Sequence, residues 1–243
     1  MTTNRLFALI PAAGGGTRTG LGLPKQYHAI AGRPVLAHTI DRLAAALPLS
    51  RTFVAIAPGD GHYASAIGAR PGVEPLPCGG PTRSATVGNA LAMLESRCVP
   101  GDWILVHDAA RPCVPVEALR RLVLELGDDD VGGLLAMPVA DTLKHGDGAP
   151  EPRVVRTEDR RQLWQAQTPQ MFRYGVLAAA YAAPGADGAT DDAQVVERLA
   201  ARGACRMPRL VAGSRANLKI TWSEDFALAA AILSAQADAE EER

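Results

Sequence analysis

Two cations, Arg18 and Lys25, flank a loop of small residues near the start of the chain, and together they suggest a phosphate-binding site. The loop from Ala12 to Gly16 holds only alanine and glycine, so side chains do not screen its backbone amides from an anion. Thr19 stands where a dinucleotide fingerprint needs glycine, and Gln26 follows Lys25 where a Walker A loop needs Ser or Thr. For the glycines alone, an ordinary turn between strand and helix is the alternative.

A carboxylate, Asp108, ends a predicted strand, residues 103–108, which begins with a short apolar run. Open α/β sheets place ligand-binding groups at the carboxyl ends of strands. One carboxylate together with substrate phosphates suits Mg²⁺. Successive strand residues face opposite sides, so we expect His107 to be a structural or capping residue rather than a second ligand.

A second glycine pair, Gly79–Gly80, precedes a predicted helix that runs to about Glu95. A helix N-terminus opened by glycines can bind an anion. The alternative is an ordinary loop with a capping Thr or Ser, and the local sequence favours that alternative.

Composition limits the class of protein. The chain has 243 residues, of which 47% are hydrophobic, and a net charge of −1, so we expect a sizeable core and no nucleic-acid partner. The four cysteines are widely spaced, which is typical of reduced thiols in the cytoplasm. There is no apolar run of membrane-spanning length and no signal-like segment, so we expect a cytoplasmic protein without a membrane partner.

Strand and helix patterns alternate from residue 5 to residue 137 and predict a three-layer α/β fold around a mostly parallel, Rossmann-like sheet. We expect residues 1–137 and 162–235 to form one domain, with no internal repeat and no linker, and residues 236–243 to fray. The predicted strands are 6–10, 52–57, 73–76, 103–108, 132–137, 205–211 and 218–220. The predicted helices are 36–47, 61–69, the helix that ends near Glu95, 115–126, 173–183, one capped by Thr190 or Asp191 that runs to 201, and 227–235 behind a capping box at 221–224.

Residues 138–161 break this alternation, because prolines and glycines interrupt two strand-like pieces, 141–145 and 153–157. The pattern predicts a hairpin that projects from the domain. A lone hairpin is only marginally stable in water, so we expect it to lie on a partner. In a two-fold dimer each arm can reach the other subunit.

Several spaced blocks resemble the 2-C-methyl-D-erythritol 4-phosphate cytidylyltransferase family and occur in the family's order. A set of ordered blocks is far more specific than one glycine loop. The blocks are 12–18 with Pro24-Lys25-Gln26-Tyr27, then 106–112, 141–144, 159–170, 190–193 and 213–221. The chain departs from the usual pattern at Pro81, where an acidic residue is common, and at Ser84-Ala85, where a more polar pair is common.

The resemblance implies a nucleotidyltransferase fold with a projecting β-arm, and a homodimer formed through residues 138–161. The implied reaction joins CTP and 2-C-methyl-D-erythritol 4-phosphate to give 4-diphosphocytidyl-2-C-methyl-D-erythritol and pyrophosphate, in the non-mevalonate isoprenoid pathway. The implied nucleotide contacts are Ala12, Ala13, Gly14, Gly16, Gly79, Gly80 and Thr86. Asp108 is the implied Mg²⁺ ligand. The implied catalytic cations are Arg18, Lys25, Lys219 and, from the neighbouring subunit's arm, Arg160. The implied polyol-phosphate contacts are Arg111, Thr168, Thr190 and the neighbouring arm's Thr142.

The chemistry of such a transfer agrees with these residue types. One phosphate must approach another, so catalysis is mostly positioning and fixed positive charge, and no Ser-His or Cys-His pair is needed. Three alternatives stay open: cytidylyl transfer to another polyol phosphate such as ribitol 5-phosphate, a transferase that uses UTP or GTP, and a non-catalytic nucleotide-binding regulatory protein. The last is disfavoured because binding alone does not need Arg18, Lys25, Asp108 and Lys219 together.

Overall fold

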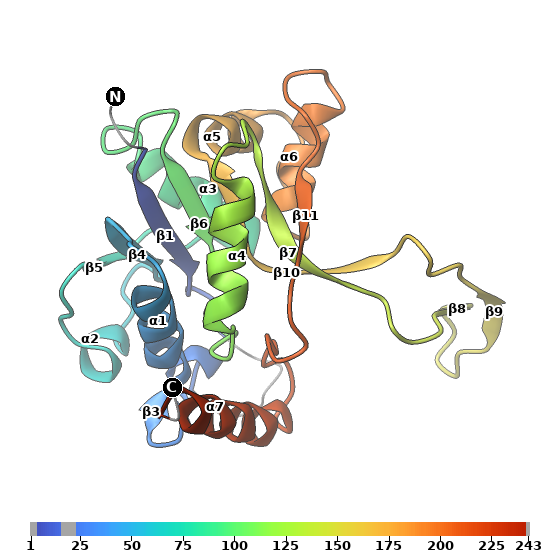
Figure 1. Ribbon diagram of the computed structural model, residues 1–243, viewed down its shortest axis with the longest axis horizontal. Coiled ribbons are helices and arrows are strands. Elements are labelled where there is room, and N and C mark those ends of the chain that lie inside the picture. Colours follow the sequence, from blue (N-terminus) through green and yellow to red (C-terminus); the bar gives the residue numbers. More distant parts are fainter. Residues whose placement is uncertain (1–3, 16–22, 242–243) are drawn as a thin grey trace.

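The computed structural model describes residues 4–15 and 23–241, which are built around a seven-stranded sheet (Figure 1). Its strand order is β11-β7-β10-β6-β1-β4-β5. The strands are β1 (Leu6–Pro11), β4 (Arg51–Ala55), β5 (Val73–Leu76), β6 (Trp103–Val106), β7 (Gly132–Pro138), β10 (Trp164–Arg173) and β11 (Arg209–Ala212). Within this sheet of the described residues, only the pairings made by β10, with β6 and β7, are antiparallel. The mostly parallel sheet expected from the alternating pattern is therefore confirmed.

Helices cover both faces of the sheet, as the predicted three layers require. The helices are α1 (Val35–Ala46), α2 (Tyr63–Ala66), α3 (Arg83–Met93), α4 (Val116–Leu126), α5 (Tyr174–Ala182), α6 (Asp192–Ala200) and α7 (Asp225–Glu241). Alternate residues of β1 enter opposite cores: Ala8 and Ile10 pack with α1, α2 and α4, whereas Phe7 and Leu9 pack with α3, α5 and α6. Because both faces are covered, the central strands are continuous apolar runs.

Two predicted strands are wrong in whole or in part, and β10 contains a proline. β10 runs through Pro169, although proline cannot donate a hydrogen bond to a strand ladder. The pairing of β10 with β7 shifts register between Ala166 and Gln170, and an irregularity of this kind is where a strand tolerates proline. Residues 218–220 are not a strand, although the Ile220 amide donates to Ala110 O at 2.9 Å. Residues 205–208 likewise precede β11 rather than belong to it.

The C-terminal helix also differs from expectation. The predicted capping box at 221–224 is replaced by Asp225, whose Oδ2 accepts hydrogen bonds from the amides of Thr221 and Trp222 at 2.7 and 2.8 Å. The helix continues to Glu241, so residues 236–241 are helical rather than frayed. Arg42 of α1 pairs with Glu240 and donates to Gln236, and these contacts extend the helix.

A two-stranded hairpin, β8 (Lys144–Gly146) and β9 (Val154–Thr157), stands clear of the body, between the end of β7 and the start of β10 (Figure 1). Backbone hydrogen bonds from Val139 N to Leu163 O and from Glu158 N to Leu143 O, both 3.0 Å, tie its two sides together. Apolar side chains on it face solvent, with Val154 63% and Trp164 42% exposed. The hairpin has the shape expected for 138–161, while its role in assembly stays a prediction.

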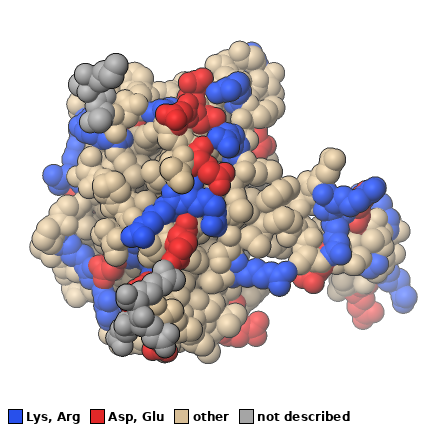
Figure 2. Space-filling view, viewed as in Figure 1, with Lys and Arg blue, Asp and Glu red and all other residues tan. Residues whose placement is uncertain are grey.

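The remaining small elements lie near the N-terminal loop. They are a 3₁₀ turn at Lys25–Tyr27 and a short ribbon made of β2 (Ala29–Ile30) and β3 (Arg33–Pro34). Figure 2 shows acidic and basic side chains interspersed over the body, and basic side chains prominent on the projecting arm. Among the residues that the structure describes, no helix is both long enough and apolar enough to cross a bilayer.

Candidate active site

A cavity of about 370 Å³ opens where β1 and β6 end, the edge at which open α/β sheets bind ligands. It gathers residues from the two ends and the middle of the sequence. Of the residues predicted from sequence, those that line it are Ala12, Ala13, Gly14, Lys25, Gly80, Thr86, Asp108 and Lys219. Gly16 and Arg18 lie outside the described residues.

The small-residue loop after β1 is held by a side chain that follows it in sequence. Gln26 is only 4% exposed, and its Nε2 donates to Ala12 O at 2.7 Å and to Gly14 O at 3.1 Å. Because these carbonyls accept hydrogen bonds from Gln26, that side chain fixes the backbone of residues 12–14. Gly79 packs behind the loop, and a Cβ on it would lie 2.3 Å from Ala13 Cβ, so glycine is required there.

The second loop forms the opposite wall through its backbone and two threonines. Gly80 N donates to Thr86 Oγ1 at 3.0 Å, and that hydroxyl donates to Thr82 O at 2.9 Å. Thr82 caps α3 by accepting a hydrogen bond from Ala85 N at 3.0 Å. The predicted capping Thr is thus confirmed, and Pro81 and Thr82 themselves line the cavity. The hydroxyl of Thr86 therefore joins the two ends of this second loop.

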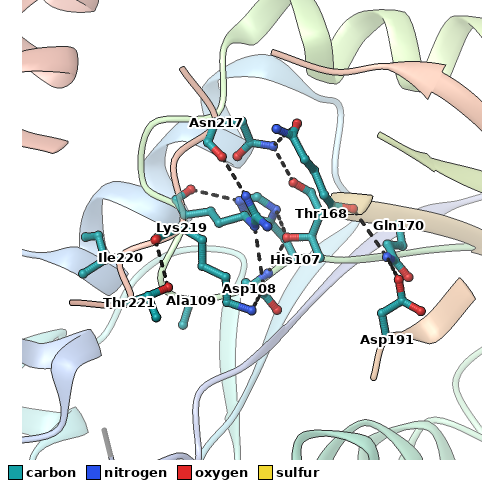
Figure 3. A network of polar contacts seen from close by, with 12 residues as sticks. His107, Asp108, Ala109, Thr168, Gln170, Asp191, Asn217, Lys219, Ile220 and Thr221 are labelled. Atoms are coloured by element: carbon teal, nitrogen blue, oxygen red, sulfur yellow. Dashed lines mark hydrogen bonds and ion pairs between the residues drawn. The ribbon is translucent and has the colours of Figure 1, made fainter. Parts of the chain in front are cut away.

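Asp108 is the electrostatic centre of the cavity (Figure 3). Its Oδ2 lies 2.8 Å from Lys219 Nζ and 3.6 Å from Arg111 Nε, while its Oδ1 accepts from Arg83 Nε at 2.9 Å. Burial acts to raise the pKa of this carboxyl, but the three cations outweigh it and hold the pKa well below its usual range. Lys25 also lines the cavity, and its Nζ donates to Ile220 O at 3.1 Å. Asp108 is therefore ionised and surrounded by positive charge.

Behind Asp108 lies a buried chain of hydrogen bonds (Figure 3). His107 is completely buried, and its Nε2 lies 3.1 Å from Arg111 O, an acceptor, so Nε2 carries the proton. Burial lowers the pKa of His107 to about 4, which keeps the ring neutral and leaves Nδ1 to accept from Thr168 Oγ1 at 3.1 Å. Thr168 Oγ1 in turn accepts from Asp108 N at 3.0 Å. His107 has the structural role expected from sequence.

Several predicted substrate contacts do not line the cavity of their own chain. Arg111 is 9% exposed and donates from Nη1 to Asn217 O at 2.7 Å, and Thr168 is committed to the chain just described. Thr190 is exposed, and its amide donates to Gln194 Oε1 at 3.0 Å. Thr142 and Arg160 are exposed on the arm, and neither lines the cavity of its own chain. The roles of these residues stay predictions.

Three side chains that sequence reasoning missed complete the site: Gln26, Arg83 and Asp192. Gln26 belongs to the Pro-Lys-Gln-Tyr segment, but nothing in the segment shows that an amide would reach back to the loop. Arg83 follows the second glycine pair, and its partner Asp192 is 109 residues further along the chain. Asp192 lies in the 190–193 block that resembles the family and beside the cap of a predicted helix, but neither feature indicates a contact with Arg83.

A mostly parallel sheet with a cationic cavity at its carboxyl edge, walled by two small-residue loops, defines an α/β protein of the nucleotidyltransferase type. The sequence profile described as 2-C-methyl-D-erythritol 4-phosphate cytidylyltransferase matches residues 6–235. The chain belongs to that family.

Relatives support the assignment over nearly the full length. Proteins of that name from Bordetella petrii and Nitrosospira multiformis are 49% and 48% identical to this chain, each covering 93% of it and 97% of the relative. A crystal structure titled 4-diphosphocytidyl-2C-methyl-D-erythritol synthase superposes with a TM-score of 0.82 at 39% identity, covering 96% of this chain and 100% of that one. The corresponding cytidylyltransferase of Thermus thermophilus gives a TM-score of 0.72 at 32% identity, covering 94% and 98%.

Proposed function

We propose that this protein transfers a cytidylyl group from CTP to 2-C-methyl-D-erythritol 4-phosphate, which yields 4-diphosphocytidyl-2-C-methyl-D-erythritol and pyrophosphate in the non-mevalonate isoprenoid pathway. The observation that carries the proposal is the convergence of Lys25, Lys219 and Arg83 on one cavity beside a loop of small residues. Family membership supplies the identity of the substrates.

In the proposed reaction, a phosphate oxygen of the polyol phosphate attacks the α-phosphorus of CTP. A new P–O bond forms while the bond from the α-phosphorus to the bridging oxygen breaks, and pyrophosphate leaves with that electron pair. Negative charge grows on oxygens that Lys25 and Lys219 can reach, so these fixed cations stabilise the transition state. The attacking phosphate is already ionised, and no side chain has to remove a proton from it.

The donor set around Asp108 fits a divalent cation that is shared with the substrate. Among the described residues there is no cluster of three or more His, Cys, Asp or Glu that could hold a metal ion alone, and Asp108 is the one carboxylate among the described residues lining the cavity. One carboxylate plus phosphate oxygens suits Mg²⁺. Mg²⁺ there would neutralise charge on the triphosphate. Lys219 contacts the same carboxylate at Oδ2 and would add its own positive charge beside the phosphates.

The arm supports a homodimer in which each subunit completes the other's site. Thr142 and Arg160 are exposed on a hairpin that stands clear of the body (Figure 1), and neither residue lines the cavity of its own chain. In a two-fold assembly, a projecting element of this kind can reach the partner. We propose that these residues contact the polyol phosphate bound by the neighbouring subunit.

The reaction is tested by measuring pyrophosphate release from each of CTP, UTP, GTP and ATP with 2-C-methyl-D-erythritol 4-phosphate or ribitol 5-phosphate. Turnover is expected only with CTP and the methylerythritol substrate, and it should stop with EDTA and return with Mg²⁺. Release with ribitol 5-phosphate alone would reassign the substrate. CTP binding without release from any pair would instead favour a regulatory protein.

The metal ligand is tested by Asp108→Asn. The variant is expected to lose most Mg²⁺-dependent turnover, and its Mn²⁺ affinity with CTP present, measured by electron paramagnetic resonance, should fall together with turnover. The circular dichroism spectrum serves as the control for folding. Unchanged Mn²⁺ affinity in a folded variant would remove Asp108 from the metal site.

A further inference from the structure

Arg83, the first residue of α3, lies between two acidic side chains that come from distant parts of the chain. Its Nε donates to Asp108 Oδ1 at 2.9 Å, and its two terminal nitrogens contact the two oxygens of Asp192 at 3.2 and 2.8 Å. The side chains of Asp108 and Asp192 are 9% and 0% exposed. A planar guanidinium matches this two-sided arrangement, whereas an ammonium group cannot bridge it.

Asp192 is itself fixed to the central sheet. The preceding residue, Asp191, caps α6 by accepting from Gln194 N at 2.9 Å, and its other oxygen accepts from Gln170 Nε2 at 2.9 Å. Gln170 Oε1 accepts from Ala193 N at 2.7 Å. Gln170 belongs to β10, where it pairs with Val106, the last residue of β6. The α6 terminus is therefore clamped to β10, which pairs with β6, the strand that precedes Asp108.

One more side chain holds Asp192 in place. Tyr181 of α5 donates its hydroxyl to Asp192 Oδ1 at 2.6 Å. Asp192 thus receives hydrogen bonds from α3 and α5 while it sits at the start of α6. With its oxygens held in this way, the carboxylate gives Arg83 a fixed partner that does not face the cavity.

We infer that Arg83 is a positioning residue: by gripping the buried Asp192, it fixes the orientation of the Asp108 carboxylate and so presents Oδ2 to Lys219 and the cavity. The inference rests on the proposed function and adds to it a positioning role for Arg83, beyond the positive charge that Arg83 brings to the cavity. The effect of Arg83 on Asp108 then depends on the planar shape of the guanidinium and not on its positive charge alone.

The test is Arg83→Lys, which keeps the positive charge and removes the fork. Displacements of about 1 Å in an active site can cost about 100-fold in rate, so kcat is expected to fall about 100-fold while KM for CTP changes less than about threefold. The matched control is Arg97→Lys. Arg97 also forks onto one carboxylate, that of Glu74, at 2.7 and 2.8 Å, but it does not line the cavity. This control should keep the wild-type kcat.

A second variant, Asp192→Asn, removes the anchor without touching the cavity and keeps the test decisive if Arg83→Lys folds poorly. Its kcat is expected to fall about tenfold. When it is combined with Arg83→Lys, kcat should fall by less than about a further twofold, because the effects of residues in one hydrogen-bond network are not additive. A multiplicative loss in the double variant would overturn the inference. So would a wild-type kcat in a folded Arg83→Lys variant, or a rise in KM alone.

A crystal structure of the Arg83→Lys variant supplies a readout that does not depend on the reaction. The Asp108 carboxylate is expected to turn from its wild-type orientation and to lose the contact of Oδ2 with Lys219. If the wild-type chain failed to release pyrophosphate, the proposed function would fall, and this structure would still decide the inference. An unmoved carboxylate would overturn it.

Discussion

The charged groups of the cavity around Asp108 and those of the projecting arm lie in opposite environments. In the cavity, an almost fully buried carboxylate binds cations that come from three separate parts of the chain. On the arm, charged groups pair with near neighbours in solvent, as in the Arg161–Asp159 pair, whose side chains are 86% and 59% exposed. The cavity is therefore organised within one chain, whereas the arm has little in its own chain to hold it in place.

This difference predicts where substitutions will act. Buried charges that lose a partner are left desolvated and cost much, whereas exposed ion pairs contribute little. Residues of the cavity should thus affect rate and stability within one subunit. Residues of the arm should affect activity only through the partner, and stability hardly at all.

The largest effect is expected from Lys25→Ala. Lys25 lines the cavity, and its positive charge matters most when negative charge builds on the transferring group. We therefore expect kcat to fall by about 10²–10³ while KM for CTP changes far less. Steady-state pyrophosphate release measures both constants. Arg51→Ala, which removes a cation paired with Glu74 on β5, is the control that should keep the wild-type rate. A raised KM with normal kcat would mean that Lys25 only binds the ground state.

The comparison is tested most directly by mixing subunits. Lys25→Ala and Arg160→Ala chains with different tags are each expected to be nearly inactive, but in a mixed dimer one site carries both defects and the other none. With random pairing, about half of the dimers are mixed, so about a quarter of all sites should be intact. The purified mixed dimer should therefore regain activity. If it stays as inactive as its parents, Arg160 acts within its own subunit.

Acid should destabilise the body of the protein through His107. Its folded pKa of about 4 lies below the ordinary value of 6.5, so between these values the unfolded state binds more protons and stability is lost as the pH falls. At about 1.4 kcal/mol per pKa unit, the loss amounts to about 3 kcal/mol. Urea unfolding at pH 7, 5.5 and 4.5 measures it. His107→Gln, which keeps a donor for Arg111 O, should flatten this dependence, and an equally steep dependence in the variant would exclude His107 as the source.

The smallest effect is expected from Arg161→Ala on the arm. The pair with Asp159 is exposed and lies between residues two apart, and such pairs are often without measurable effect on stability. The urea midpoint should therefore match that of the wild type. A clear loss of stability would show that the arm is held to the body more firmly than its exposure indicates.

Much of the fold was predictable because apolar periodicity and punctuation by glycine and proline are local signals. The loop after β1 and the position of Asp108 after β6 were found in this way. The cluster around Asp108 was only partly predictable. The Arg83–Asp192 contact depends on how α3 and α6 approach each other, and no local pattern encodes that approach.

Two residues of β10 show the same limit of local sequence signals. A proline disfavours a central strand, but the register shift in β10 accommodates Pro169. The family resemblance implies that Thr168 contacts the substrate, which stays a prediction, and nothing in the sequence indicates that its hydroxyl joins Asp108 N to His107. Sequence identifies the residue, but the partner of a hydroxyl is decided by packing.

Strand β10 joins the two contrasting regions in one piece of backbone. Its first three residues are exposed at the base of the arm, while residues further along are buried against β6 and β7, where Thr168 backs Asp108 and Gln170 clamps α6. An insertion at the arm tip, near Gly148, would change only how far the arm extends from the body. A single residue inserted between Trp164 and Gln170 would move the base of the arm out of register with the wall of the cavity. Over evolutionary time, the tip can vary in length and sequence, while the angle of the arm and the shape of the site are inherited together.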